Sequence, residues 1–535
     1  MLKIITEKMG MNVIELVALL CYFVLVLAIG VYFFWQSRRG GGTEKEYFLG
    51  NRNMNGWVSA LSAGASDMSA WVLMGLPGSI YLAGMGQIWI AVGLFLGTFA
   101  AWNWVAPVLR RYSIVAGDAI TIPQFLTSRF CTDRKGIMVI SALVFVATYC
   151  VYTASSLYAC GTLFNTVLGM EPKTAMIIAS VVIVVYTFLG GYNAVCWTDF
   201  FQGMLMLGAL MLIPILAAVM MKSPGFVAPQ VVLPGNYYDI LSGGSFNWKS
   251  ISDIISGLGW GLGYFGMPHI LIRYFSVKSE KEMKKSRIVG CSWLFLILLV
   301  TSLVGLLGRR FLGDVLTKSK DAETLVFINM VRNVFEWIGN NIGLMAVATF
   351  CAGILLSAIL AAAMSTADSQ LLASASAFAS DLYKPLFRKN ASDREMLWAG
   401  RIIVVVIAAV AFFIAASPSC KGIMGLVSCA WAGFGSAFGP VIILALFWKR
   451  MTYNGALAGI VAGFAVDALW YAFMSWTAIY EIIPGFFAGM VATVVVSLLS
   501  KKPGAEVLAV FDKARLATED IAEKAVEKTV KNQYL

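Results

Sequence analysis

Ten residues, SAGASDMSAW from Ser62 to Trp71, place an aspartate, three serines and a glycine inside an otherwise apolar stretch. Carboxylate, hydroxyl and backbone carbonyl oxygens are the ligands that hard cations prefer. A charged side chain in the middle of a membrane costs about 2.5–3.5 kcal/mol on insertion scales. We therefore expect Asp67 to serve a cation site, whereas Ser62 and Ala63 are equally typical of close helix packing.

A second polar stretch lies about 300 residues later, in LLSAILAAAMSTADSQLLASASAFASD from Leu355 to Asp381. Two hydroxyls and a carboxylate, Ser365, Thr366 and Asp368, follow one another closely there, and Ser369 comes next. Hydroxyls from this stretch and backbone carbonyls from the first would form a sodium cage of neutral oxygen ligands. The alternative is a packing face, because small residues at helical spacing also allow two helices to approach.

The elements that position these residues are two interrupted membrane helices. Gly64 and the GLPG cluster at 75–78 flank the first polar stretch, and SGLGWGLGYFGMPH at 256–269 contains five glycines and Pro268. Irregular backbone at membrane depth is tolerated where it lines a cavity or is buried in protein. Secondary transporters place such broken helices at matching positions of two inverted repeats, beside the binding sites.

About thirteen membrane spans are predicted from runs of roughly 20 apolar residues. The interrupted segments are the second and the seventh, five spans apart, as a pair of five-helix inverted repeats requires. The spans lie near 12–35, 57–82, 87–107, 137–167, 174–192, 198–221, 250–272, 289–312, 341–378, 400–416, 423–448, 454–475 and 479–499. The predicted divisions are a first helix with its loop (1–56), repeat one (57–225), repeat two (250–450), two final helices (451–500) and a tail (501–535).

The composition agrees with an all-α polytopic membrane protein. Of the 535 residues 59% are hydrophobic and 13% are charged, against roughly 25% charged in soluble domains. Alternating ten-residue segments, which a membrane β-barrel would show, are absent from the sequence. Nine cysteines without a CxxC pair and a single histidine favour neither a disulfide framework nor a zinc site.

Lys and Arg account for the net charge of +11, and they gather in alternate short loops. This is the positive-inside pattern, which places the N-terminus outside and the C-terminus in the cytoplasm. The pattern explains the net charge without binding to nucleic acid. The loop at 309–340 is also basic, but long loops follow the rule less strictly. In the tail, an apolar stripe of Val507, Val510, Phe511 and Leu516 predicts an amphipathic helix. A solvated tail is favoured over a partner-binding one.

Five motifs in order carry a resemblance to a known family. They are ALSAGASDMSAWVLMGLPG (60–78), FLGGYNAVCWTDFFQ (188–202), GWGLGYFGMPHIL (259–271), LLSAILAAAMSTADSQLL (355–372), and AWAGFGSAFGPV with NGALAG (430–441 and 454–459). On these residues the chain resembles the sodium/solute symporter family, most closely its bacterial sodium/proline branch, from about residue 46 to 500. The resemblance implies a LeuT-like fold, alternating access driven by sodium, and a multi-pass protein of the bacterial inner membrane.

Residue by residue, the resemblance also implies two sites. The sodium ion would be held by the carbonyls of Ala65, Met68 and Ala362 and the hydroxyls of Ser365 and Thr366, with Asp67 as a nearby charge. L-proline would be held by six residues on three spans, namely Ser69, Trp71, Tyr152, Trp260, Tyr264 and Pro268. These types suit the ligand, because a pyrrolidine ring packs on aromatic faces and its ammonium is attracted to them.

Three features of the sequence qualify the resemblance. The family usually has Gln where this chain has Met267, which weakens the assignment of proline. Asp199, Asp368 and Ser369 could form a second cation or proton site, since other branches of the family place a further sodium there. The alternative is a buried acid hydrogen-bonded to serines. Arg52 matches a family position linked to coupling, and a positive-inside anchor is an equal explanation.

The sequence leaves other functions open. One alternative keeps the symporter and changes the solute to another small amino or carboxylic acid. A channel or a transporter-like nutrient sensor is a second class, although a 35-residue tail is short for a signalling domain. An enzyme is the weakest alternative and no catalytic residue is assigned, because no nucleophile stands beside Asp67, Asp199 or Asp368. The sequence sets no oligomeric state.

Overall fold

The computed structural model describes residues 13–39, 43–241, 245–318 and 322–516, and these ranges fold almost entirely into helices. The α-helices are α2 (Val13–Arg39), α3 (Glu44–Leu49), α4 (Gly56–Asp67), α5 (Gly75–Ala83), α6 (Ile88–Ala100), α7 (Ala106–Val115), α8 (Ile122–Arg129), α9 (Gly136–Leu168), α10 (Pro172–Met221), α11 (Trp248–Gly259), α12 (Pro268–Ser276), α13 (Glu280–Leu312), α14 (Ala322–Ile342), α15 (Met345–Ser376), α16 (Asp393–Ala415), α17 (Gly422–Phe447), α18 (Tyr453–Phe473), α19 (Ile482–Leu499) and α20 (Ala505–Leu516).

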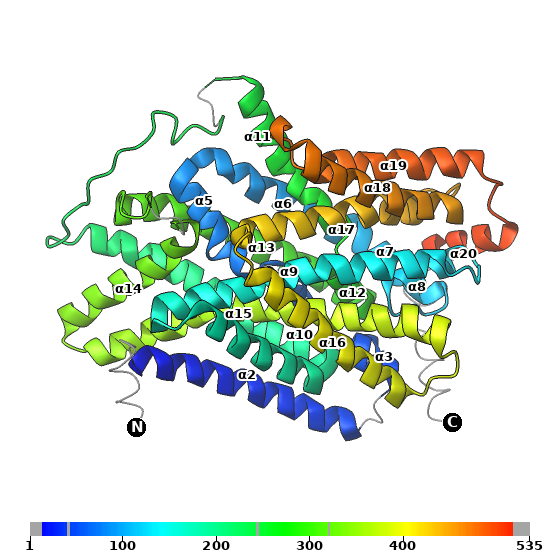
Figure 1. Cartoon of the computed structure of the whole chain (residues 1–535), viewed down its shortest axis with the longest axis horizontal. Coiled ribbons are helices and arrows are strands. Elements are labelled where there is room, and N and C mark those ends of the chain that lie inside the picture. Colours follow the sequence, from blue (N-terminus) through cyan, green and yellow to red (C-terminus); the bar gives the residue numbers. More distant parts are fainter. Residues whose placement is uncertain (1–12, 40–42, 242–244, 319–321, 517–535) are drawn as a thin grey trace.

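The long helices lie roughly parallel to the longest axis of the molecule (Figure 1). α2 begins at the left end of this view, and α20 lies at the right end. Among the described residues, ten helices are long and apolar enough to cross a membrane. The other three predicted spans are the shorter helix over Pro172–Val185 and the two interrupted segments. The all-helical prediction is thus confirmed, while the total of thirteen spans stays a prediction.

The second predicted span is broken, as the sequence indicated. Asn55 caps α4 by accepting the N–H of Val58 at 2.9 Å, and the helix ends at Asp67. The chain then passes through Met68 and Ser69 into a short 3-10 turn, η2, before α5 continues the span. The Ser69 side chain caps this turn by accepting the N–H of Trp71.

The seventh predicted span is broken in a different way. α11 runs into a six-residue 3-10 segment, η5 (Trp260–Phe265), and α12 restarts at Pro268. Proline suits the first turn of a helix because its missing N–H needs no partner there. Gly261 packs so closely that a Cβ would lie 2.2 Å from the carbonyl oxygen of Gly93 on α6. The glycines of this span therefore permit close helix contact.

Spans five and six are the two parts of α10, which meet at a bend in place of the predicted gap at 193–197. The chain bends at Gly191, where φ is 60° and ψ is −164°. Glycine adopts this conformation without the steric cost that a Cβ imposes. The motif that contains Gly191 therefore marks a bend, two residues before the predicted division.

Two further expectations from the sequence need correction. The long loop expected at 309–340 contains α14, which follows the end of α13. The tail is helical at α20, as predicted, but this helix is not simply solvated. Phe511 is 3% exposed and its ring lies 6.1 Å from that of Tyr112, with the guanidinium of Arg129 at 5.0 Å. The rest of the tail, 517–535, lies outside the described residues, as does the N-terminal stretch 1–12.

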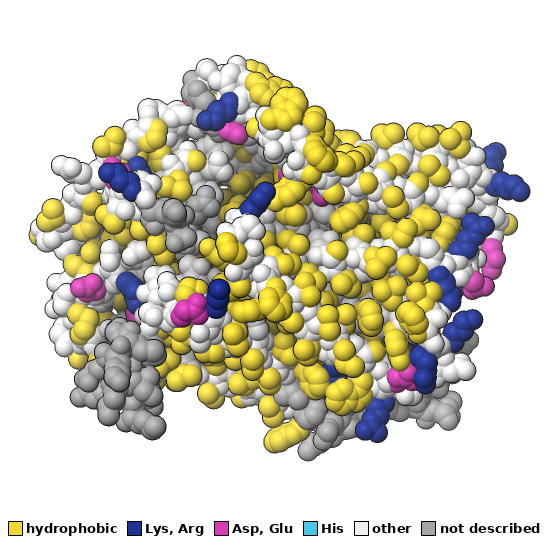
Figure 2. All heavy atoms as spheres, viewed as in Figure 1, with side chains coloured by type: hydrophobic (Ala, Val, Ile, Leu, Met, Phe, Trp, Pro, Cys, Tyr) yellow, Lys and Arg dark blue, Asp and Glu magenta, His cyan; other side chains and the backbone are white. Residues whose placement is uncertain are grey.

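The surface separates into an apolar middle and a charged end. Figure 2 shows mostly hydrophobic side chains over the centre of the face, and Lys and Arg gathered at the right-hand edge, where α8 and α20 lie. Large apolar residues such as Val24, Phe413 and Leu499 are 67%, 73% and 83% exposed. Exposure on this scale is expected where lipid is the solvent.

Candidate functional site

The predicted sodium ligands of the second and ninth spans meet in the structure. The Ser365 hydroxyl of α15 lies 2.9 Å from the carbonyl oxygen of Ala65 on α4 and 3.2 Å from that of Ala362. The hydroxyl of Thr366 is buried and has no hydrogen-bond partner. The Ser365 hydroxyl with its two carbonyl oxygens, and the unpartnered hydroxyl of the next residue, are of the ligand types that fit a hard monovalent cation.

Met68 completes the predicted ligand set at the end of α4. Its N–H still bonds to the carbonyl of Gly64, at 2.9 Å, and the helix stops at this residue. The last carbonyls of an α-helix have no partner within the helix. The break therefore frees carbonyl oxygens at the end of α4, of which that of Ala65 contacts the Ser365 hydroxyl, and the role of Met68 as a ligand stays a prediction.

Asp67 lies between the ion ligands and the predicted solute residues. The Tyr264 hydroxyl donates to one oxygen of its carboxylate, while the other oxygen, Oδ1, is buried without a partner. Its backbone carbonyl accepts from Tyr152 and from the indole of Trp71, each at 3.4 Å. Tyr264, Tyr152 and Trp71 thus bond to Asp67, which lies between the predicted sodium ligands Ala65 and Met68.

Aromatic rings surround this point. The Trp71 and Trp260 rings have centroids 6.1 Å apart, so the two broken helices meet through their indoles. Trp431 of α17 lies 5.2 Å from Tyr264 and donates its indole N–H to the carbonyl of Trp260 at 2.7 Å. Tyr480 stacks on Trp260 at 5.1 Å. The indole and phenol faces form an apolar wall with few polar groups, which is typical of a small-molecule site.

The predicted solute residues are closed off from solvent in this conformation. Trp71, Tyr152, Trp260 and Tyr264 are 1%, 0%, 6% and 2% exposed. Pro268 is also buried, at the start of α12. The structure is therefore occluded around both predicted sites, and a solute would need a conformational change to enter.

The predicted second cation site contains an arginine. Asp199 and Ser369 are 3.4 Å apart, as expected, but the guanidinium of Arg273 lies 3.2 Å from Asp199 and also donates to Ser369. Ser62 donates to the same carboxylate oxygen at 2.6 Å and accepts from Arg273 at 3.1 Å. Asp368 is buried next to Ser369 in α15. This arrangement favours an internal ion pair over a second ion at this place.

Arg52 is buried and bonded on all sides, not merely anchored at a membrane surface. It donates to Asp118 at 2.8 Å, Ser113 at 3.0 Å and the carbonyl of Ala119 at 2.7 Å. It also reaches the carbonyl of Phe275 near the end of α12, at 2.8 Å. Arg52 thus links α12, in the second broken helix, to the loop between α7 and α8. Its role in coupling stays a prediction.

Sequence reasoning did not assign Arg273, Trp431 or Tyr480. The predicted seventh span ended at 272, one residue before Arg273, so this residue received no role. Trp431 stands in the AWAGFG motif, which was noted without a role, and Tyr480 was assigned only to the last span. An arginine five residues after the helix-starting Pro268, in an otherwise apolar run, was the signal that could have revealed the first.

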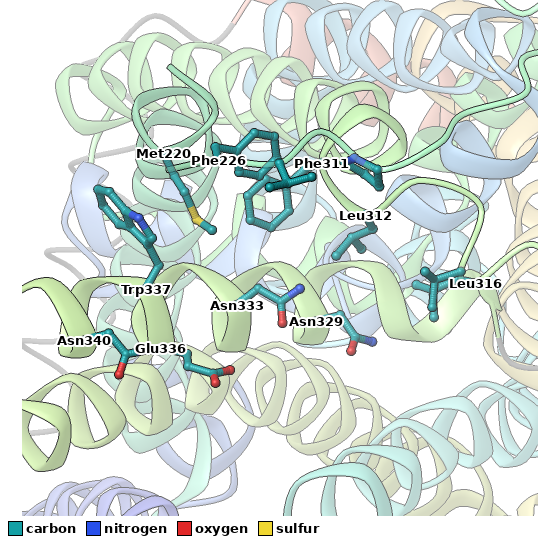
Figure 3. A pocket seen from close by; sticks show the side chains of 13 residues that line it. Met220, Phe226, Phe311, Leu312, Leu316, Asn329, Asn333, Glu336, Trp337 and Asn340 are labelled. Carbon is teal, nitrogen blue, oxygen red and sulfur yellow. The ribbon is translucent and has the colours of Figure 1, made fainter. Parts of the chain in front are cut away.

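A separate pocket of about 470 Å³ shares no residue with these sites. Figure 3 shows Met220, Phe226, Phe311 and Trp337 around it, with a row of polar side chains along α14 that comprises Asn329, Asn333, Glu336 and Asn340. Because none of the predicted ion or solute residues lines it, the pocket is not the predicted solute site.

Comparison with curated proteins gives relatives along nearly the whole chain. The osmoregulated proline transporter OpuE of Bacillus subtilis (strain 168) is 40% identical over 497 residues, which cover 92% of this chain and 96% of the relative. The high-affinity proline transporter PutP of the same organism is 42% identical over 468 residues, 87% and 95% of the two chains. The sodium/proline symporter of Escherichia coli (strain K12) is 41% identical over 493 residues, 91% and 93% of the two chains.

Solved structures share the fold. A Na+-coupled sialic acid symporter in a substrate-bound outward-open state has a TM-score of 0.73 at 19% identity, over 92% of this chain and 99% of that one. Mhp1, a nucleobase-cation-symport-1 family transporter in a closed conformation, has a TM-score of 0.53 at 14% identity, over 90% and 98%. The LeuT-like fold expected from the resemblance is confirmed.

The family model described as the sodium:solute symporter family matches residues 47–463. This range contains both broken helices, the hydroxyl-rich helix α15 and the aromatic wall up to Trp431. The chain belongs to the sodium:solute symporter family.

Proposed function

We propose that the protein is a sodium-coupled secondary active symporter that imports L-proline by alternating access. The observation that carries the proposal is the juxtaposition of an oxygen-rich contact between α4 and α15 and a cluster of aromatic side chains at one break, between α4 and η2. Sodium and proline are then the transported partners, and no enzymatic step is involved. The names of the three relatives given above, all proline transporters, support the same solute.

Sodium fits the ion site by chemistry. Ala65, Ala362, Ser365 and Thr366 offer neutral oxygens, and Asp67 supplies one carboxylate nearby. Hard monovalent cations bind to carbonyl and hydroxyl oxygens of this kind, whereas softer metals prefer nitrogen and sulfur ligands. In the described part of the chain, no group of three or more His, Cys, Asp or Glu side chains could hold another metal ion.

The coupling follows from the position of Asp67. A sodium ion between α4 and α15 would fix the opened backbone at 65–68. Tyr152 and Trp71 both donate to the carbonyl of Asp67, which lies within this stretch. Ion binding would therefore set the position of two solute-contacting side chains. By linkage, the solute must strengthen sodium binding by the same factor.

Proline suits the aromatic chamber formed by Trp71, Trp260 and Tyr264. A secondary ammonium gains from aromatic faces, at about 0.5–2 kcal/mol per contact depending on desolvation. The pyrrolidine ring fills apolar space without exposing polar atoms. Met267, fully buried at the N-cap of α12, is the one residue that favours a different small amino acid, since it offers no hydrogen bond beside the chamber.

The deciding experiment is uptake of radiolabelled proline into proteoliposomes with an inward sodium gradient. We expect accumulation with sodium and none when potassium replaces it while the proton gradient is collapsed. Competition by a panel of unlabelled amino and carboxylic acids identifies the solute. Unchanged uptake in potassium would remove the sodium claim, and stronger competition by another acid would replace proline.

We also propose that the end of the molecule with α8 and α20 faces the cytoplasm of a bacterium and that the N-terminus lies outside the plasma membrane. The gathering of Lys and Arg at that end (Figure 2) supports the orientation through the positive-inside rule. Accessibility of a single reporter cysteine at Asp512 or at Glu171 to an impermeant thiol reagent, in a variant without the native cysteines, tests it.

A further inference from the structure

Two bridges join α4 to α15, and they lie one helical turn apart. In the first, the predicted sodium site, Ser365 reaches the carbonyl of Ala65. In the second, Arg273 bonds to both Ser62 of α4 and Ser369 of α15. Ser62 precedes Ala65 by three residues, and Ser369 follows Ser365 by four, so the two bridges are about 5 Å apart along each helix.

The second bridge has the chemistry of a cation site apart from the arginine. Its oxygens are the Asp199 carboxylate and the hydroxyls of Ser62 and Ser369, all within buried residues. The carbonyl of His269 also accepts from Arg273, at 2.9 Å. Oδ1 of Asp199 is buried without a partner, so the carboxylate has acceptor capacity that the ion pair does not use.

We propose that Arg273 is a fixed internal cation, which takes the place of a second sodium ion between α4, α10 and α15. Because this inference concerns the sodium chemistry of the same helices, it rests on the proposed function. The guanidinium is covalently attached to the second broken helix, through α12, so it holds the two helices without being transported. Removing it would convert its oxygen ligands into a second sodium site.

Asp199 has a matching role in this arrangement. It is the carboxylate that the structure pairs with Arg273, one turn from the ion site. Two positive charges at such a distance repel each other unless a negative charge lies between or beside them. Asp199 thus sets the sodium affinity as a positioning residue, by neutralising Arg273. Asp368 of α15 also attracts Arg273, and it is left unchanged in every variant below.

The test is direct binding of ²²Na⁺ to the purified full-length protein, with potassium as the balancing salt. The parent is expected to bind one sodium with a Hill coefficient near one. Arg273→Met should bind two sodium ions with a Hill coefficient well above one, and Arg273→Lys, which keeps the charge, should bind one. Asp199→Asn should weaken sodium binding at least about tenfold, and Asp199→Asn combined with Arg273→Met should restore affinity to within about threefold of the parent.

One sodium per protein in Arg273→Met, at parental affinity, would overturn the inference. If Arg273→Met does not yield folded protein, the Asp199→Asn variant decides, because unchanged sodium affinity there overturns it equally. A parent that binds no sodium refutes the proposed function instead. A parent that binds sodium but not proline refutes the solute and leaves the role of Arg273 standing.

Discussion

The two broken helices open for different purposes. The break between α4 and η2 releases carbonyl oxygens beside hydroxyls of α15 and carries one carboxylate, that of Asp67. The break along η5 presents aromatic rings and lets neighbouring helices approach through glycines such as Gly261 and Gly263. The difference agrees with the proposed division of labour, in which the second span supplies ion ligands as well as Trp71, and the seventh span contributes to the solute site alone.

The largest effect should come from filling the close contact of the seventh span. Gly261→Ala places a Cβ 2.2 Å from the carbonyl oxygen of Gly93 and 3.2 Å from the N–H nitrogen of Gly97, both backbone atoms of α6. Overpacking costs about 1–3 kcal/mol or more when the backbone must move. We expect loss of folded protein or of uptake, measured by size-exclusion profile and proline transport.

Gly208→Ala is the matched control, because a Cβ at Gly208 on α10 meets no atom within 4 Å. This variant should behave as the parent in both measurements. A well-folded, fully active Gly261→Ala protein would break the claim that the seventh span depends on close packing against α6.

The next effect concerns the charge on the second span. Asn at position 67 can still accept from Tyr264, so Asp67→Asn removes charge while keeping that hydrogen bond. We expect the half-saturating sodium concentration to rise about a hundredfold, which corresponds to about 2.7 kcal/mol. Asp67→Glu, which keeps the charge, should be impaired less. Sodium-dependent proline uptake gives both values, and a parental sodium curve for Asp67→Asn would remove Asp67 from the ion site.

A smaller effect is expected from a single cage oxygen. Thr366→Ala deletes a buried hydroxyl that has no other partner, and it should raise the half-saturating sodium concentration about tenfold. Thr366→Ser keeps the oxygen and should change this concentration by less than about threefold. If both variants show parental sodium dependence at normal expression, the ion is bound elsewhere.

The smallest expected effect concerns an aromatic residue of the proposed solute site on the seventh span. Trp260→Phe keeps an aromatic face on η5 and leaves the backbone carbonyl that accepts from Trp431. The half-saturating proline concentration should rise about two- to fivefold, a cost of about 0.4–1 kcal/mol, with an unchanged sodium curve. Trp104→Phe, on a side chain 62% exposed, is the control. An equal shift in the sodium curve would contradict the division of labour.

The sequence was informative where chemistry and backbone irregularity coincide. Asp67 in a glycine-flanked polar stretch, and Ser365 with Thr366 in a small-residue helix, pointed to one ion site, and the structure places Ser365 in hydrogen-bond distance of Ala65, two residues before Asp67. A buried acid and paired hydroxyls leave a visible signal in an apolar background. Their roles as ligands stay predictions until sodium binding is measured.

Residues whose role depends on which neighbour the side chain faces were harder to predict from the sequence. Trp431 lies among small apolar residues of α17, and nothing in its neighbourhood indicates that it points toward Tyr264 instead of lipid. Arg273 was misplaced because apolarity alone ended the predicted span too early. The burial of Phe511 was also missed, since an amphipathic stripe does not say which surface it meets, and here it meets α7.

The hydrogen bond between Ser365 and Ala65 also bears on how the protein is made. Its two partners are 300 residues apart in sequence. A chain synthesised from its N-terminus inserts the second span long before the ninth emerges, so the opened carbonyls at 65–68 cannot yet meet the hydroxyls of α15. Unsatisfied polar backbone is costly in lipid, and distant contacts form late. The proposed ion site is therefore among the last features of the transporter to assemble. Until then, the carbonyls at 65–68 need other hydrogen-bond partners, such as water, lipid headgroups or an insertion partner.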